Sequence, residues 1–429
     1  MSEIIGLRRH YNADIATKTK SALPQHVTVS GMCSVCTGCG QCEIGQKAKT
    51  GKTLFPEPFG AAQFAAEKRL PNIKDIQILP EMWGESNFFP EVSTETEVGG
   101  FKCSVPVTIA ALGSTKVASS KGDVLSEGAA LAGIPRVIGE NVFASFGKKG
   151  LKRMIESFLD NYQKKGAIIV QANVIDQKLG VPELAVELGA HAVELKYGQG
   201  AKQGLGGEIR FKDEKLVKKF KKYGYMVLNH WNGSYERHVY PGDITKKGLR
   251  DTLVKYSELG VPLWIKVAIG RGIKEFLKEC QRIKKEEKVP LTCVTIDGHG
   301  GGTGMSPWLI MNETCLPSIT ILPIIREIKP DFDVIVAGGF TSGVDVAKAM
   351  MLGADGVAMG RAMVVAGTVN GKKGIVNFVN AIKEELQMIA TVERVKEVSK
   401  LKGRTKNLLA LTEEAGRLFG IGSEARKIL

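Results

Sequence analysis

The chain has 429 residues, of which 43% are hydrophobic and 24% are charged, and its formal net charge is +14. This composition is that of a globular protein long enough for one large domain with an appendage. No apolar run reaches the roughly 18 residues of a membrane-spanning helix, and the first residues, MSEIIGLRRHYNADIATKTK, lack the apolar stretch of a secretory signal. We therefore expect a cytoplasmic protein without a membrane segment.

The positive charge is spread over several lysine-rich segments. They include Lys215–Lys222, Lys274–Lys288 and Lys396–Lys406, and the aromatic residues, 7% of the chain, do not interleave with them. Such runs are typical of solvated helix faces. A docking face for an acidic redox protein is the second interpretation and nucleic-acid binding the third, so we predict no nucleic-acid partner.

Four of the eight cysteines form one run, CSVCTGCGQC, within an N-terminal region of weak periodicity. The run consists of Cys33, Cys36, Cys39 and Cys42. Cysteines this close cannot all form good disulfides, so thiolate ligation of a metal is the natural use. The spacing is similar to the start of the ferredoxin pattern C-x2-C-x2-C-x3-C-P, although its last interval is shorter and Glu43 replaces the proline. A 4Fe–4S cluster is the first choice and a zinc site the second. Cys103, Cys280, Cys293 and Cys315 are isolated and predicted to be buried thiols.

From about residue 102 the chain alternates short apolar runs, rich in β-branched residues, with segments of helical periodicity. The predicted strands are Ser104–Gly113, Pro135–Glu140, Gly166–Asn173, His191–Gly198, Pro262–Gly270, a sixth that begins at Leu291, Asp333–Phe340 and Ala354–Ala362. Eight strands, each followed by a helix, predict an α/β fold of the (β/α)8 barrel type. Its boundaries are residues 102–370, between an N-terminal extension (1–101) and a helical C-terminal segment (371–429). Residues 225–243 fit neither pattern and are not assigned.

Functional groups in such barrels lie at the carboxyl ends of the strands. That rule places Gly113, Ser114, Glu140, Gln171, Lys196–Lys202, Lys266 and Asp297–Thr303 around one mouth. Gly113, Ser114, Gln171 and Lys266 are predicted to contact a cofactor, and Lys266 is expected to point into the barrel. The final two strands end in glycines, and backbone N–H groups there commonly hold a phosphate. The phosphate candidates are Gly338, Gly339, Gly360 and Arg361.

Two glycine-rich loops resemble a known family. GQGAKQGLGGE (Gly198–Glu208) and IDGHGGGTGMSP (Ile296–Pro307) are similar to the hallmark loops of the FMN-binding synthase domain of glutamate synthases, and the resemblance covers roughly Pro106–Gly367. It implies a (β/α)8 barrel that holds FMN and reduces 2-iminoglutarate, formed from 2-oxoglutarate and ammonia, to glutamate.

The resemblance also implies roles for single residues. Gln199 and Lys202 match the 2-oxoglutarate site, and Glu140 resembles the glutamate of the family's Gly-Glu-Gly-Gly loop. The matches to FMN-binding positions are Gly301, Gly302, Gly338, Gly339, Gly360 and Arg361, with Thr303 beside them. A reduced flavin carries negative charge near N1 and O2, which Lys266 would stabilise.

Several positions depart from the family pattern. Glu208 replaces the glutamine that ends QGAK-PGEGGQ, and Gly300 replaces the aspartate of SGHDGGTG. The arginine expected after the third strand is missing from NVIDQKLG, and no cysteine follows Cys315. We therefore expect weaker 2-oxoglutarate binding than in the family, and an amine-bearing substrate paired with Glu208. The start, Met-Ser-Glu, lacks the cysteine nucleophile of a glutaminase domain, so ammonia would be free or come from another subunit.

The sequence therefore predicts an FMN-dependent oxidoreductase that reduces an imine or keto acid such as 2-iminoglutarate. Electrons would come from an external, ferredoxin-like carrier through the cysteine cluster, and a separate glutaminase-type subunit is a further possible partner. Lys202, Gln199, Glu140 and Glu208 are the predicted catalytic residues. An N-methylglutamate-forming transferase subunit and a non-catalytic assembly subunit are the alternatives. A homo-oligomer is expected.

Overall fold

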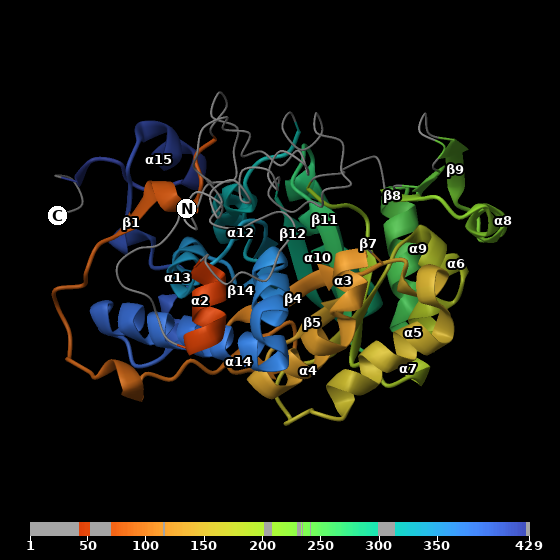
Figure 1. Ribbon diagram of the computed structural model, residues 1–429. Coiled ribbons are helices and arrows are strands. Elements are labelled where there is room, and N and C mark those ends of the chain that lie inside the picture. The colour runs from red at the N-terminus through yellow and green to blue at the C-terminus, as the bar shows by residue number, and fades with distance from the viewer. Residues whose placement is uncertain are drawn as a thin grey trace.

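The computed structural model describes residues 43–51, 70–114, 116–200, 208–229, 233, 235–240, 242–298 and 314–425. Eight parallel strands close into a barrel in the order β11-β12-β13-β14-β4-β5-β6-β7 (Figure 1). They are β4 (Val107–Leu112), β5 (Arg136–Ile138), β6 (Ile168–Ala172), β7 (Ala192–Lys196), β11 (Leu263–Ala268), β12 (Leu291–Asp297), β13 (Asp333–Ala337) and β14 (Gly356–Met359). Seven of these strands lie within predicted strand segments, and β12 begins at Leu291, the predicted start of the sixth. The predicted (β/α)8 barrel is therefore confirmed.

Helices surround this barrel on its outside (Figure 1). They are α3 (Lys116–Ser120), α4 (Gly122–Ala132), α5 (Val142–Leu159), α6 (Val174–Lys178), α7 (Val181–Glu187), α9 (Lys246–Ser257), α10 (Ile273–Glu287), α12 (Leu322–Ile328), α13 (Gly343–Leu352) and α14 (Arg361–Val392). Local signals define their ends. The Ser342 side chain accepts a hydrogen bond from Asp345 N at the start of α13, and Gly353 ends that helix in the left-handed conformation.

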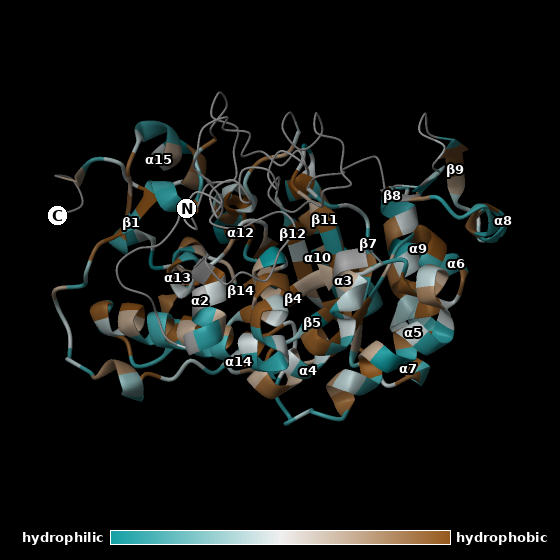
Figure 2. Ribbon diagram, viewed as in Figure 1, coloured by the Kyte–Doolittle hydropathy of each residue, from teal (hydrophilic) through white to brown (hydrophobic). Residues whose placement is uncertain are grey.

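Side chains alternate between the two faces of each barrel strand, so they pack in two separate hydrophobic cores, one outside and one inside the barrel. Leu263, Ile265 and Val267 of β11 face the helices and belong to the large outer core, whereas Trp264 belongs to a separate cluster inside the barrel. Figure 2 shows the matching pattern outside, where the helices carry both hydrophobic and hydrophilic residues.

A hairpin closes the barrel at the amino ends of its strands. It consists of β2 (Thr96–Val98) and β3 (Phe101–Cys103), paired antiparallel. The Trp264 indole donates a hydrogen bond to Gly99 O at 3.1 Å, and Gly99 N donates to Asp333 Oδ2 at 2.7 Å. A Cβ added at Gly99 would lie 2.1 Å from the Trp264 ring, so only glycine fits there. We call this layer the floor, and the opposite end, where the carboxyl ends of the strands lie, the mouth.

The two terminal regions pack on the same side of the barrel. The N-terminal helix α2 (Glu43–Thr50) lies against α14, and Lys47 forms a buried ion pair with Glu385 at 2.6 Å. Strand β1 (Ile76–Ile78) pairs antiparallel with β15 (Leu408–Ala410). Helix α14 continues through residue 370, with non-helical torsions at Asn370 and Gly371. Beyond Val392, the described chain is helical in α15 (Glu413–Phe419) and in two short 3-10 segments, Val398–Leu401 and Thr405–Asn407.

The unassigned segment 225–243 contains most of a three-stranded antiparallel sheet. Its strands are β8 (Glu208–Phe211), β9 (Met226–Asn229) and β10 (Tyr235–His238), in the order β8-β10-β9, with α8 (Glu214–Lys222) between β8 and β9. We call residues 208–240 the arm. It connects β7 to α9 and lies at one side of the barrel (Figure 1).

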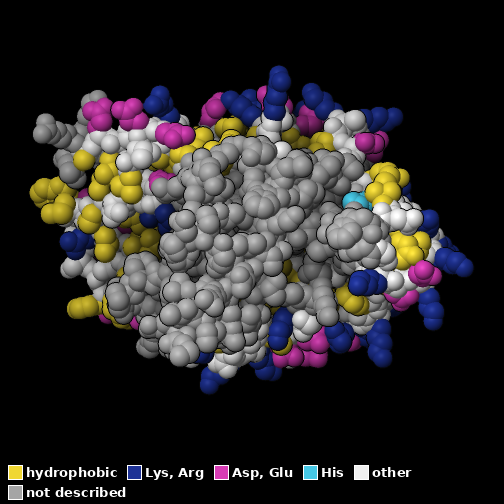
Figure 3. Space-filling model, turned by 45° about the horizontal axis from the view of Figure 1, so that its top comes forward, with side chains coloured by type: hydrophobic (Ala, Val, Ile, Leu, Met, Phe, Trp, Pro, Cys, Tyr) yellow, Lys and Arg dark blue, Asp and Glu magenta, His cyan; other side chains and the backbone are white. Residues whose placement is uncertain are grey.

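Basic and acidic side chains lie next to one another at several places on the described surface. Figure 3 shows lysine and arginine side chains next to acidic ones around its edge, and exposed pairs include Lys148–Glu187, Lys152–Glu156 and Arg250–Glu287. Of the isolated cysteines, Cys103, Cys280 and Cys293 are buried as predicted, whereas Cys315 is partly exposed. Among the described helices, none is both long enough and apolar enough to cross a membrane.

Candidate functional site

Polar side chains fill one half of the barrel interior on the mouth side of the floor. Strands β6, β7, β11 and β12 are neighbours and supply this polar sector. Its buried members are Gln171, Glu194, Lys196, Lys266, Thr295 and Asp297. The opposite strands contribute small or apolar interior residues, including Ala110, Val137, Ala337 and Ala358. The mouth therefore has one polar and one apolar side.

Glu194 lies at the centre of the polar sector. Gln171 Nε2 donates a hydrogen bond to Glu194 Oε2, and Thr295 Oγ1 donates to Glu194 Oε1 at 2.9 Å. Burial raises the pKa of the Glu194 carboxyl, and the nearby Lys266 ammonium opposes that shift without cancelling it. Both oxygens of this buried acid therefore have donors, as burial requires.

Lys266 points into the barrel, as its position on the fifth predicted strand indicated. Its Nζ lies 3.3 Å from Asp297 Oδ2, and both side chains are less than a tenth exposed. Burial alone would lower the pKa of Lys266, but the charges of Asp297 and Glu194 outweigh burial and raise it. Burial raises the pKa of Asp297 by more than Lys266 lowers it. Gly200 N also donates to Asp297 Oδ2, at 3.4 Å.

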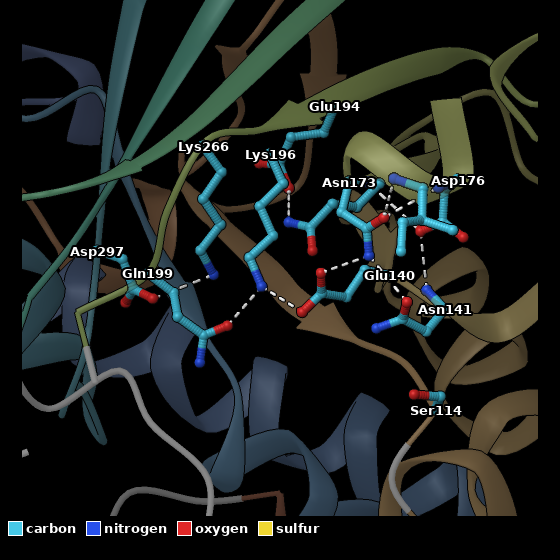
Figure 4. Close-up of polar contacts among 12 residues, drawn as sticks. Ser114, Glu140, Asn141, Asn173, Asp176, Glu194, Lys196, Gln199, Lys266 and Asp297 are labelled. Atoms are coloured by element: carbon cyan, nitrogen blue, oxygen red, sulfur yellow. Dashed lines mark hydrogen bonds and ion pairs between the residues drawn. The ribbon is translucent and has the colours of Figure 1, made fainter. Parts of the chain in front are cut away.

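A second polar group connects β5, β6 and β7 (Figure 4). Lys196 Nζ contacts Glu140 Oε1 and donates a hydrogen bond to Gln199 Oε1 at 2.6 Å. Asn173 Nδ2 donates to Glu140 Oε2 at 2.8 Å. Glu140 and Gln199, two predicted site residues, therefore both contact Lys196, which the sequence placed at the mouth without a role of its own.

The carboxylate of Glu140 is fixed through the turn that follows β6. Asn173 caps α6, and its side chain accepts hydrogen bonds from Ile175 N and Asp176 N. Asp176 Oδ2 accepts one from Asn141 N at 2.9 Å. Burial raises the pKa of the Asp176 carboxyl to about 7. One capping motif thus orients the side chains around Glu140.

The arm brings an arginine to the edge of the mouth. Arg237 on β10 is almost fully buried, and its guanidinium lies over the Phe220 and Tyr225 rings, 4.5 and 4.7 Å from their centroids. Its Nη2 lies 3.4 Å from Ser114 Oγ, a predicted mouth residue, and its Nη1 lies 3.3 Å from Ser145 Oγ. Among the described residues, no carboxylate forms an ion pair with Arg237. Its guanidinium is contacted by rings and hydroxyls, while the carboxylates of Glu140 and Asp176 stabilise its charge from a longer distance.

The glycines predicted to hold a phosphate follow β13 and β14. Gly338 and Gly339 follow β13 with φ of 118° and 86°, and a Cβ added at Gly339 would meet no described atom within 4 Å. Gly360 precedes Arg361, the first residue of α14, and a Cβ there would find its nearest described neighbours at 3.8 Å. Packing against described residues therefore does not require glycine at Gly339 or Gly360, and the amino end of a helix attracts anions.

Gly113 differs from these glycines. A Cβ at Gly113 would lie 2.5 Å from Glu140 O, and one at Gly139 would lie 2.6 Å from Gly113 N. These two glycines let β4 and β5 approach closely at the mouth. The structure thus gives Gly113 a packing reason, and its predicted contact with a cofactor stays a prediction.

Comparison with known proteins identifies the family. Residues 147–370, more than half of the chain, match the conserved region in glutamate synthase. The chain belongs to the glutamate synthase family. An archaeal-type glutamate synthase (NADPH) of Thermotoga neapolitana is 28% identical over 302 residues, which are 68% of this chain and 54% of that protein. The chain spans about half the length of this relative.

Solved structures agree on the fold of this glutamate synthase family chain. A flavocytochrome b2 variant with sulfite bound has a TM-score of 0.57 at 20% identity, covering 83% of this chain and 81% of that one. A mandelate oxidase variant with a monooxide FMN adduct has a TM-score of 0.52 at 17% identity, covering 77% and 87%. At these identities the likeness shows the barrel fold alone.

Several predicted residues of this family member fall outside the described residues. They are Lys202, Gly301, Gly302, Thr303, Cys33, Cys36, Cys39 and Cys42. For Glu208 only the backbone is described, as the first residue of β8. Within the described ranges, no group of three or more His, Cys, Asp or Glu side chains could hold a metal ion.

Proposed function

We propose that this chain is an FMN-dependent oxidoreductase whose reaction takes place at the barrel mouth. One observation carries the proposal. A buried lysine, Lys266, lies in the mouth of a barrel whose β13 and β14 are followed by Gly339 and Gly360, where an added Cβ would meet no described atom closer than 3.8 Å. Membership of the glutamate synthase family supports it, and so do two structural neighbours, a mandelate oxidase variant with an FMN adduct and the flavin-binding domain of flavocytochrome b2.

The residues at the mouth suit FMN in charge and in space. Gly338, Gly339 and the N–H groups at the start of α14 would hold its phosphate. Lys266 would face the part of the ring that becomes negative on reduction. When bound, FMN supplies hydride chemistry, and the protein supplies orientation and electrostatics.

For the substrate, we propose a carboxylate-bearing imine or keto acid such as 2-iminoglutarate. The ion pair of Lys196 and Glu140 supports this class because it offers both charges side by side at the rim. Lys196, with Gln199 beside it, can donate hydrogen bonds to a substrate carboxylate. Glu140 can accept one from an imine or amine nitrogen, held in place by Asn173.

The purified protein is expected to be yellow and to release FMN when it is heated. Flavin in the supernatant would be identified by absorbance and chromatography. Titration of the oxidised protein with 2-oxoglutarate, glutamate and N-methylglutamate should then perturb the flavin spectrum, and Lys202→Ala should remove the response without removing FMN. A colourless protein with no releasable flavin would disprove the proposed cofactor, whereas flavin without any response would disprove only the substrate class.

We further propose that the cysteine run binds an iron–sulfur cluster that passes electrons between FMN and a ferredoxin-like carrier. The run ends at Cys42, next to α2. Lys47 of α2 pairs with Glu385, whose Oε2 accepts a hydrogen bond from Gly343 N at the start of α13. The helix that follows the cysteines is thus connected, through Glu385, to the start of α13, a few residues after the proposed phosphate-binding glycines Gly338 and Gly339.

Anaerobically purified protein is expected to contain about four irons per chain, as four thiolate ligands imply. Cys36→Ser and Cys39→Ser should each remove most of the iron and leave FMN bound. Cys315→Ser, which changes a cysteine outside the run, is the matched control and should keep the iron. One equivalent of zinc and no iron would show that the cysteines form a zinc site instead.

A further inference from the structure

Two buried carboxylates, Asp297 and Glu194, partly neutralise the positive charge of Lys266 inside the barrel. We propose that they thereby lower the reduction potential of the bound flavin. The inference rests on the proposed FMN site and adds control of that cofactor by two carboxylates. Asp297 acts through Lys266 and is a positioning residue in that sense.

The geometry leaves Lys266 facing two acids. Asp297 Oδ2 lies 3.3 Å from Lys266 Nζ and receives a second donor, Gly200 N, at 3.4 Å. Glu194 lies closer to the floor, where its two oxygens are held by Gln171 and Thr295. All three charged side chains are more than nine-tenths buried, so solvent screens them little. Figure 4 shows Lys266 turned toward Asp297.

A paired lysine stabilises a distant anion less than an unpaired one does. Two opposite charges 3.3 Å apart act at longer range as a dipole, whose field falls off faster than that of a single charge. Reduction adds negative charge to the flavin ring, and a cation in the mouth favours it. With Asp297 beside Lys266 that preference is weaker, so the flavin needs a more strongly reducing electron donor.

Asp297 stands where the family loop that this chain resembles has a different residue. The resembling loop, SGHDGGTG, has serine at the position of Asp297 and aspartate at the position of Gly300. A serine at position 297 would leave Lys266 without this partner. Asp297 is the last residue of β12, opposite Ala268 of β11, so its side chain lies on the same face of the sheet as that of Lys266, two residues before Ala268.

The test is the two-electron potential of bound FMN, measured by equilibration with reference dyes. In Asp297→Asn and Asp297→Ser the equilibrium should move about tenfold toward reduced flavin, a rise of about 30 mV. Asp297→Glu keeps the charge and should stay close to the unaltered protein. Glu194→Gln should raise the potential by a smaller amount, and Lys266→Met should lower it.

Each outcome decides the inference. Unchanged or lower potentials in Asp297→Asn and Asp297→Ser, with FMN still bound, would overturn it and leave the proposed function intact. If both variants lose their fold or their flavin, an unchanged potential in Glu194→Gln overturns it instead. Absence of flavin from the unaltered protein would overturn the proposed function and this inference together.

Discussion

Lys266→Met is expected to lower the free energy of unfolding by about 3–5 kcal/mol at neutral pH. The substitution keeps the length of the side chain and removes its charge, so Asp297 and Glu194 remain buried without the cation that faces them. Breaking a buried pair costs this much because the remaining charge is both unpaired and desolvated. Urea unfolding followed by circular dichroism would measure the change.

The loss should depend on pH in a definite direction. Burial already raises the pKa values of Glu194 and Asp297, and removal of Lys266 takes away an opposing influence. The folded variant then binds more protons than the unfolded chain, whose carboxyl pKa values lie near 4. Stability should therefore fall as pH rises above about 4, and the variant should be closer to the unaltered protein at about pH 5 than at about pH 8.

The matched control for this lysine is on the surface. Lys372 pairs with Glu127 at 3.0 Å, and both side chains are partly exposed. Lys372→Met should change stability by at most about 1 kcal/mol. Equal losses in the two methionine variants, or a loss in Lys266→Met that does not vary with pH, would contradict the charge balance described for the mouth.

Trp264→Ala is expected to cost about 3–5 kcal/mol of folding free energy, measured by the same urea titration. The side chain is fully buried in the floor, and its removal would also leave Gly99 O without the indole donor. Because Gly99 approaches the ring so closely, the cavity cannot fill without displacing the β2–β3 hairpin.

Trp83→Ala is the control for this change. Trp83 is 87% exposed, so its removal should leave the free energy of unfolding within about 0.5 kcal/mol of that of the unaltered protein. A midpoint for Trp264→Ala as high as that of the control would mean that the hairpin does not depend on Trp264.

The barrel could be predicted because its signals are local. Runs such as Pro262–Gly270 are apolar, end in glycine and are separated by helical periodicity, so strand number and order followed from the sequence alone. The period of two also placed Lys266 inside. The serine cap of α13 and its terminal Gly353 belong to the same class of local signal.

The sequence placed Gln171, Lys196, Lys266 and Asp297 at the mouth, but the contacts within the polar sector could not be predicted because they depend on which strands face one another. Period two assigns Glu194, Lys196 and Asp297 to the interior, but the stagger of the closed barrel decides which of them meet. Lys196, the last residue of β7, contacts Glu140, which follows β5, and Gln199, three residues further along its own chain segment.

The arm escaped prediction for a related reason. Strand β8 pairs with β10 across an intervening helix, and no two-residue turn marks that pairing. Arg237 lies in a short segment without a recognisable motif, although it reaches Ser114. The sequence could have hinted at it through the tyrosine and valine content of residues 225–240, which favours strands.

The pairing of β1 with β15 has a consequence for how fragments of this protein should be made. Ile76–Ile78 and Leu408–Ala410 lie more than 300 residues apart, yet each provides the other's hydrogen-bonding edge. An expression fragment that stops at residue 370, where the family match ends, would keep β1 as an unprotected edge strand and uncover the face of α2 that packs on α14. Exposed edges of this kind recruit other chains, so such a fragment would tend to aggregate even though it carries every barrel strand.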